Sequence, residues 1–218
     1  MIKYPHVFLF LLIFSFNINA QNDSHPHEHK YGGLHHWEIP SKDPDRIILT
    51  FNGDPSTKRA VTWRTDLSVE NSEAQIAVAG VNSSFANEAT SYIATTEKFD
   101  LGLYKSNKSL VVNYHSVVFE NLKPNTLYAY RVGSAQNWSE WIQFKTANSD
   151  YSPTQFVYFG DAQNDILNHW SRVIRMAYQT APNASFVIHA GDLVDTAHKD
   201  NEWAQWFKAG GFIHSQWT

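Results

Sequence analysis

Residues 156–165 read FVYFGDAQND, an apolar and aromatic run that ends on a glycine followed by Asp161. The same pattern recurs at residues 185–195, SFVIHAGDLVD, where a second glycine is followed by Asp192. Between these runs, apolar residues of the segment 166–178 recur at the offsets of an amphipathic helix. Strand, helix and strand in this order predict a βαβ unit, with two parallel strands that are buried on both faces.

The two aspartates each follow the carboxyl end of a predicted strand. In an open parallel sheet these ends border one crevice, so we expect Asp161 and Asp192 to face it together. Two carboxylates in one crevice repel each other, and either a shared proton or cations can relieve that repulsion, with metal cations as the favoured interpretation. Carboxylate oxygens suit Mg, Mn, Ca, Fe or Zn ions, and one carboxylate can bridge two ions about 3.5–4 Å apart. The alternative interpretation is that each aspartate caps a following helix.

The segment between residues 43 and 147 follows a different pattern, with short runs of β-branched and aromatic residues separated by turn residues. This pattern predicts an antiparallel sandwich. In one run, Trp63 alternates with polar neighbours and is expected in the core. In another, Tyr128 and Tyr130 share one strand face. The clearest candidate strands are RIILTFNG, AVTWRT, AQIAVAG, SVVFENL, LYAYRVG and EWIQFKT. No carboxylates or histidines cluster in this segment, which indicates an accessory domain.

The first twenty residues have the features of a secretory signal: Lys3, then an apolar run, then a small-residue cleavage site at Ala20. The apolar run is shorter than the roughly 20 residues that span a bilayer, so we expect cleavage and no stable membrane anchor. The chain is therefore predicted to be exported, to the extracellular space or the periplasm. Residues 21–40 contain five histidines and are expected to form a flexible leader, with metal scavenging as the alternative role.

Composition excludes several classes of protein. The 218 residues are 43% hydrophobic, which is enough for packed cores, and the formal net charge is -4. The sequence contains no basic patch of the kind that would indicate a nucleic-acid partner. The chain has no cysteine, which excludes disulfides, thiol catalysis, a cysteine-based zinc site and anchoring as a lipoprotein. The sequence does not indicate an oligomeric state.

Several motifs together resemble one family. RIILTFNGDPSTKRAVTWRTD, YHSVVFENLKPNTLYAYRVG and NWSEWIQFKT resemble the fibronectin-type N-terminal domain of purple acid phosphatases. FVYFGDAQND and FVIHAGDLVDTAHKDNEWAQWF resemble the opening of the calcineurin-like metallophosphoesterase domain that follows it. The expected fold is an all-β immunoglobulin or fibronectin III-like sandwich followed by an incomplete α/β (βαβ) metallophosphoesterase segment. The expected division is signal peptide 1–20, leader 21–40, sandwich 41–148 and phosphoesterase segment 154–218.

The resemblance implies a secreted, metal-dependent phosphomonoester hydrolase of the acid phosphatase type, with a phosphate ester as its substrate. Asp161 would hold one metal ion and Asp192 would bridge two. The ions would be two divalent or trivalent ions drawn from Fe, Zn or Mn. The metal-bound hydroxide would attack phosphorus in line while the ions neutralise the growing charge.

The sequence departs from the family in three ways. Asp195 occupies the position of the family's metal-ligating tyrosine, and Gln163 occupies a position where related phosphoesterases have histidine. The later GNH, VxxH and GHxH blocks are absent, which suggests a truncated chain and leaves its activity undecided. Gln163, Asp195 and His198 are secondary candidates, as ligands or as neighbours of the metal, and no catalytic residue is assigned. His189 and His214 lack the ligand context, and core positions are expected for a histidine such as His189.

Two other functions come into question. In the first, the chain is a non-catalytic binding or docking protein that uses the fibronectin III-like domain. The second, nucleotide binding, is disfavoured because neither apolar run leads into a G-x-G-x-x-G or Walker-type loop. The aromatic face of the segment 200–210, DNEWAQWFKAG, is expected to pack in a core or against the sandwich.

Overall fold

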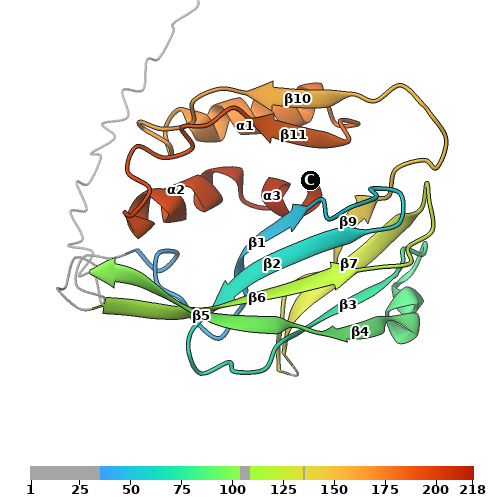
Figure 1. Cartoon of the computed structure of the whole chain (residues 1–218), viewed down its shortest axis with the longest axis horizontal. Coiled ribbons are helices and arrows are strands. Elements are labelled where there is room, and N and C mark those ends of the chain that lie inside the picture. Colours follow the sequence, from blue (N-terminus) through green and yellow to red (C-terminus); the bar gives the residue numbers. More distant parts are fainter. Residues whose placement is uncertain (1–34, 104–108, 135) are drawn as a thin grey trace, which may run out of the picture.

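The computed structural model describes residues 35–103, 109–134 and 136–218 (Figure 1). The predicted signal peptide and most of the predicted leader lie outside the described residues. Two antiparallel sheets form the first part of the fold, and a two-stranded sheet with three helices forms the second. The elements are β1 (Asp45–Thr50), β2 (Arg59–Thr65), β3 (Glu73–Val78), the 3-10 helix η1 (Ser83–Glu88), β4 (Thr90–Ile93), β5 (Thr95–Leu103), β6 (Ser109–Phe119), β7 (Leu127–Ser134), β8 (Asn137–Trp138), β9 (Ile142–Lys145), β10 (Phe156–Phe159), α1 (Trp170–Thr180), β11 (Phe186–His189), α2 (Asp200–Gly210) and α3 (Ile213–Gln216).

The two antiparallel sheets have the strand orders β1-β2-β6-β5 and β4-β3-β7-β8, and β9 also pairs with β7. All six candidate strands of this region coincide with observed strands. The sequence did not reveal β4, β5 and β8, which lie at the edges of their sheets. Edge strands bury little and tolerate polar residues, and β4 has no buried residue. Their hydrophobic alternation is therefore too weak to identify them.

The sandwich core lies between the two sheets. Trp63 is fully buried there, as predicted, and its Nε1 donates to Ser72 Oγ at 3.1 Å. Ser72 Oγ in turn donates to the Gly133 carbonyl at 2.6 Å, so the buried polar atoms are satisfied. The Tyr128 hydroxyl accepts from the Lys123 amide at 2.8 Å, a corner contact of the kind found in immunoglobulin-type sandwiches.

The second part of the fold is built on β10 and β11, which pair in parallel over four residues each with α1 between them in sequence. Helix α1 begins at Trp170, four residues later than the apolar pattern suggested. Residues 166–169 instead form a turn, in which the Ser171 amide donates to the Ile166 carbonyl five residues back and not four as in an α-helix. Ile166 is still buried, so its apolar signal marks the core and not the helix.

Only one face of the two-stranded sheet is covered. Phe159 is buried in the core beneath β10, whereas Tyr158 is 64% exposed and Ile188 is 40% exposed. The prediction that both strands are buried on both faces is therefore wrong for the described residues. The physical reason is that alternate side chains of a strand point to opposite faces, and the face of Tyr158 has no layer packed on it.

Helices α2 and α3 lie between the two-stranded sheet and the sandwich (Figure 1). The Tyr130 hydroxyl donates to the Ser215 carbonyl at 2.6 Å, which fixes α3 to the sandwich. On α2, Phe207 lies 5.7 Å from the Arg46 guanidinium, measured to the ring centroid. The predicted contact between the aromatic helix and the sandwich is confirmed. No helix among the residues described has the length and apolar character needed to cross a membrane.

Candidate metal and phosphoester site

The loops that follow β10 and β11 lie against each other. The amides of Ala162 and Gln163 both donate to the Asp192 carbonyl, at 2.9 Å and 3.0 Å. Gln163 Nε2 also donates to Asp192 Oδ2 at 3.2 Å. Parallel pairing of β10 and β11 places their carboxyl ends at one edge, and these bonds join the two loops there. The structure thus brings Gln163 to Asp192, with Asp161 one residue before the first donor.

Asp192 adopts a backbone conformation that is rare for a residue with a side chain. Its φ is 48°, and the preceding Gly191 has a φ of 120°. The left-handed region costs an L-residue about 1–2 kcal/mol, and such positions occur often at functional sites. The helix-capping alternative does not hold here, because the N-cap residues of α1 and α2 are His169 and Lys199.

The carboxylates of Asp161 and Asp192 are both exposed, and neither forms an ion pair with a described lysine or arginine. A cation would therefore meet uncompensated negative charge at this edge of the sheet. The donor set is nevertheless small. Within the described parts of the chain, no three histidine, aspartate or glutamate side chains are grouped so that they could hold a metal ion.

The other two predicted candidates make contacts elsewhere. Asp195 Oδ2 accepts from Thr196 Oγ1 at 3.2 Å. His198 is exposed and lines a pocket at the start of α2. Neither residue hydrogen-bonds to Asp161 or Asp192 in the described structure.

Two other histidines of this region, the buried His214 and the half-buried His189, pack against aromatic rings, whereas His169 is exposed. His214 stacks on Trp206 with ring centroids 3.9 Å apart, and burial lowers its pKa to about 4. His189 lies among aromatic rings, including Trp170 at 5.5 Å, and burial lowers its pKa as well. Both imidazoles are therefore neutral at pH 7, and both serve as aromatic packing groups.

Comparison with known proteins bears on the identity of the chain. Residues 44–146 match the family model described as "Purple acid Phosphatase, N-terminal domain". The chain is purple acid phosphatase-like. It is 29% identical over 163 residues to human "Acid phosphatase type 7" and 30% identical over 166 residues to the mouse protein of that name. These alignments cover 74% and 75% of the chain but 35% of each relative, so the chain spans about a third of their length.

A solved structure described as "Structure of PhoD" resembles the fold of this purple acid phosphatase-like chain. The TM-score is 0.53 at 12% identity, over 81% of this chain and 38% of that one. At this identity the likeness concerns the fold alone. The structural alignment covers 81% of the chain, which is more than residues 44–146 matched by the family model. The fold likeness therefore extends beyond those residues.

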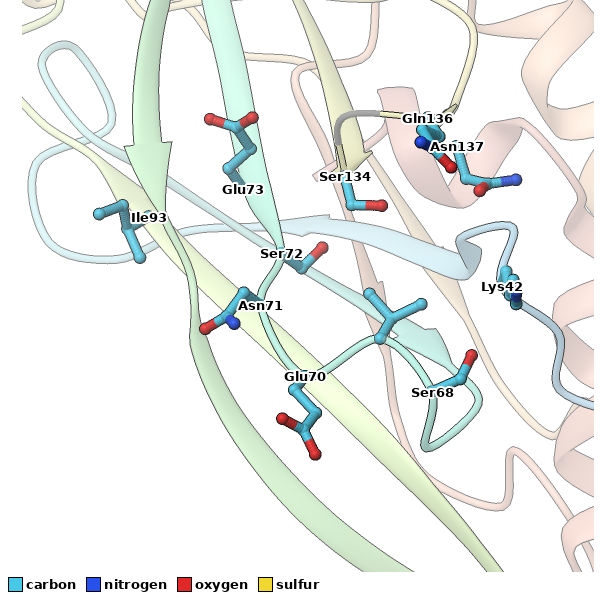
Figure 2. A pocket seen from close by; sticks show the side chains of 11 residues that line it. Lys42, Ser68, Glu70, Asn71, Ser72, Glu73, Ile93, Ser134, Gln136 and Asn137 are labelled. Atoms are coloured by element: carbon cyan, nitrogen blue, oxygen red, sulfur yellow. The ribbon is translucent and has the colours of Figure 1, made fainter.

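Neither of two well-formed pockets among the described residues is lined by Asp161 or Asp192. The first has a volume of about 740 Å³ and lies in the sandwich. Figure 2 shows the mostly polar side chains around it, including Glu70, Glu73 and Ser134. The second has a volume of about 840 Å³ and lies where β5 and β6 meet α2.

Sequence reasoning missed a buried ion pair between the two parts of the fold. Arg46 Nη1 and Nη2 donate to the two carboxylate oxygens of Asp200 at 2.6 Å and 2.8 Å. Both side chains are only 3% exposed. The partners are 154 residues apart, so no local pattern could have indicated the pair. The only signal in the sequence was the presence of two charged residues beside apolar runs.

Proposed function

We propose that this chain contributes two carboxylate ligands, Asp161 and Asp192, to the site of an exported, metal-dependent phosphomonoester hydrolase. The observation that carries the proposal is the contact between the loops after β10 and β11, where the Asp192 carbonyl accepts two amides of the neighbouring loop. Support also comes from the similarity to proteins named acid phosphatase. The predicted signal peptide supports export, and the sandwich acts as an accessory domain.

The residues present fit a two-ion centre only in part. Carboxylate oxygens and the Gln163 amide oxygen are hard donors of the kind that Mg, Mn and Fe prefer. A dinuclear centre needs several protein ligands per ion, and the described residues supply too few. No catalytic step is therefore assigned to a metal here. The role of the chain is to hold Asp192 at the sheet edge through the two backbone bonds and the Gln163 side chain.

A metal titration with a matched variant tests the proposal. Mn²⁺ is titrated into the full chain and binding is followed by electron paramagnetic resonance, with 4-nitrophenyl phosphate hydrolysis as a second readout. Asp192→Ala should weaken Mn²⁺ binding about tenfold or more and remove any hydrolysis, because it deletes a proposed ligand. Glu120→Ala, which removes an exposed carboxylate of the sandwich far from the proposed ligands in sequence, is the control. Equal Mn²⁺ affinity in wild type and Asp192→Ala would contradict the proposal.

The docking function is the second candidate, because the sandwich has a complete core and a pocket of its own (Figure 2). In that case Asp161→Ala and Asp192→Ala should leave all binding properties unchanged. The manganese titration separates the two functions, since only the hydrolase proposal requires a carboxylate at position 192.

A further inference from the structure

The pocket between the sandwich and α2 combines aromatic walls with a volume suited to a small molecule. At about 840 Å³ it falls within the range of small-molecule sites, which often lie between domains. Phe99 and Tyr114 line it from β5 and β6, while Trp203 and Phe207 line it from α2. Phe99 is 55% exposed, so the pocket is open to solvent on that side. The proposal made for Asp161 and Asp192 does not involve this pocket.

The charges at the base of the pocket are balanced. Arg46 is paired with Asp200 through two hydrogen bonds. Behind it, Arg64 donates to both carboxylate oxygens of Asp45, at 2.8 Å and 2.5 Å. Two buried guanidinium groups are thus matched by two carboxylates. The base therefore presents no free cation to a ligand and no net charge.

The rim of the pocket carries negative charge. Glu97 and Asp100, both from β5, line it, and neither forms an ion pair with a described lysine or arginine. Asp100 accepts hydrogen bonds from the Ser109 hydroxyl and the Gly102 amide, which lower its pKa. Its carboxylate is therefore ionised at neutral pH. Carboxylates next to aromatic rings distinguish this pocket from the polar pocket of Figure 2, whose lining includes no aromatic residue.

We propose that this pocket binds a compact organic cation of the alkylammonium class, with a quaternary ammonium group as the best fit. Aromatic faces attract cations, and the apolar shell of an alkylammonium ion can be buried against them at low desolvation cost. The pocket already contains one such contact, since the Arg46 guanidinium lies 5.7 Å from the centroid of Phe207. Glu97 and Asp100 supply the charge complementarity that selects a cation over a neutral molecule of the same shape.

A pair of isosteric probes tests this assignment. Choline and its neutral isostere 3,3-dimethylbutan-1-ol are titrated separately into the full chain, and binding is measured by calorimetry and by tryptophan fluorescence. Trp203 in the wall should report occupancy. We expect choline to bind about tenfold more tightly than the neutral alcohol, because only choline engages the rings and the carboxylates electrostatically. Equal affinity for the two probes, or no binding of choline, would overturn the proposal.

Three variants locate the site. Glu97→Gln and Phe99→Ala should each lower choline affinity about threefold to tenfold, since each removes one element of recognition. Both side chains are exposed, so the fold should be retained, which circular dichroism checks. Glu70→Gln makes the same charge change in the other pocket and should leave choline binding unchanged. If Glu70→Gln and Glu97→Gln lowered choline affinity equally, only the net charge of the protein would matter, and this result would contradict the proposed site.

The same chemistry can come from a free metabolite or from a lipid headgroup. Flotation with phosphatidylcholine vesicles, beside the choline titration, distinguishes these sources. Binding of choline without vesicle flotation identifies a free ligand. Flotation that excess choline and Phe99→Ala both abolish identifies the headgroup. Flotation that neither abolishes would place the lipid contact elsewhere and count against the pocket.

Discussion

The sandwich and the β10–β11 region differ in how completely they bury their apolar side chains. The sandwich closes its core between two sheets, with Trp63 and Tyr130 fully buried. The β10–β11 region has two strands, and Phe156, Tyr158 and Ile188 remain 49%, 64% and 40% exposed on the uncovered side. A two-stranded sheet alone is at best marginally stable in water. The second region therefore depends on its helices, and through them on the sandwich.

The dependence runs through a small number of contacts. Helix α3 is held by Tyr130, and α2 is held by the Arg46–Asp200 pair. The coupling free energy of such contacts is the same in both directions, but the sandwich also has a complete core of its own. The sandwich keeps its core if the second region opens, whereas the second region loses its support if the sandwich unfolds. This asymmetry can be tested by disrupting each region in turn.

Removing a core tryptophan from each region should give the largest effects. Trp63→Ala should lower the free energy of unfolding by about 4 kcal/mol, since deleting a large buried ring leaves a cavity. Hydrogen exchange should then rise in the sandwich strands and in α3 together. Trp170→Ala, at a position only 4% exposed, should raise exchange in residues 156–189 while the sandwich stays protected. Equal loss of protection in the sandwich for both variants would show a single cooperative unit.

Breaking the ion pair between the regions should have the next largest effect. Asp200→Asn leaves the buried Arg46 charge uncompensated, and the free energy of unfolding should fall by about 3 kcal/mol. Arg64 Nη1, which lies 3.8 Å from Asp200, loses that neighbouring carboxylate as well. Urea unfolding measures the change, and hydrogen exchange should show α2 opening first.

The chain offers a matched control for this variant. Lys58 and Glu120 form an ion pair at the same N–O distance of 2.6 Å, but their side chains are 40% and 51% exposed. Glu120→Gln should cost less than about 1 kcal/mol, because water screens an exposed pair. A cost for Asp200→Asn no larger than that of the control would show that the buried pair does not couple the two regions.

The sequence predicts the features of this molecule that follow from the alternation of apolar and polar residues and from the order of the strands. Trp63 is predictable as a core residue because apolar and polar residues alternate around it in sequence, but the equal burial of Arg64, which pairs with Asp45, is not. The contact between the loops after β10 and β11 follows from parallel pairing, which puts both carboxyl ends at one edge. The proposed ligand role of Asp161 and Asp192 remains a prediction, because contact between loops does not by itself establish metal binding.

Other features depend on long-range geometry that a sequence does not reveal. The apolar pattern places the start of α1 too early because Ile166 and Leu167 are apolar although they lie in a turn, and the pattern does not distinguish a turn from a helix. Arg46 has a positive φ, 50°, which an arginine rarely adopts and no pattern indicates. The pocket walls come from β5 and α2, about a hundred residues apart in sequence. Such sites appear only once the chain has folded.

Acid should weaken each region through one buried histidine, and the effect on each single region should be the smallest of the three. Burial lowers the pKa of His115 in the sandwich and of His214 in the second region to about 4. In the unfolded chain a histidine has its ordinary pKa of about 6.5, so stability is fully present above pH 6.5, where both states are neutral. It is lost as the pH falls from 6.5 towards 4, by about 2 kcal/mol per histidine at pH 5.

His214→Phe separates the two contributions, because phenylalanine keeps the stacking on Trp206 and cannot be protonated. At pH 5 this variant should retain hydrogen-exchange protection in α2 and α3, while the sandwich loses protection as in the wild type. His115 accounts for that remaining loss, since its ring bonds Thr65 and Thr96 inside the sandwich and is unaffected by the change. If the pH dependence of the second region is unchanged in His214→Phe, its acid sensitivity must come from protonation within the sandwich. The second region would then open only because the sandwich that supports it is weakened.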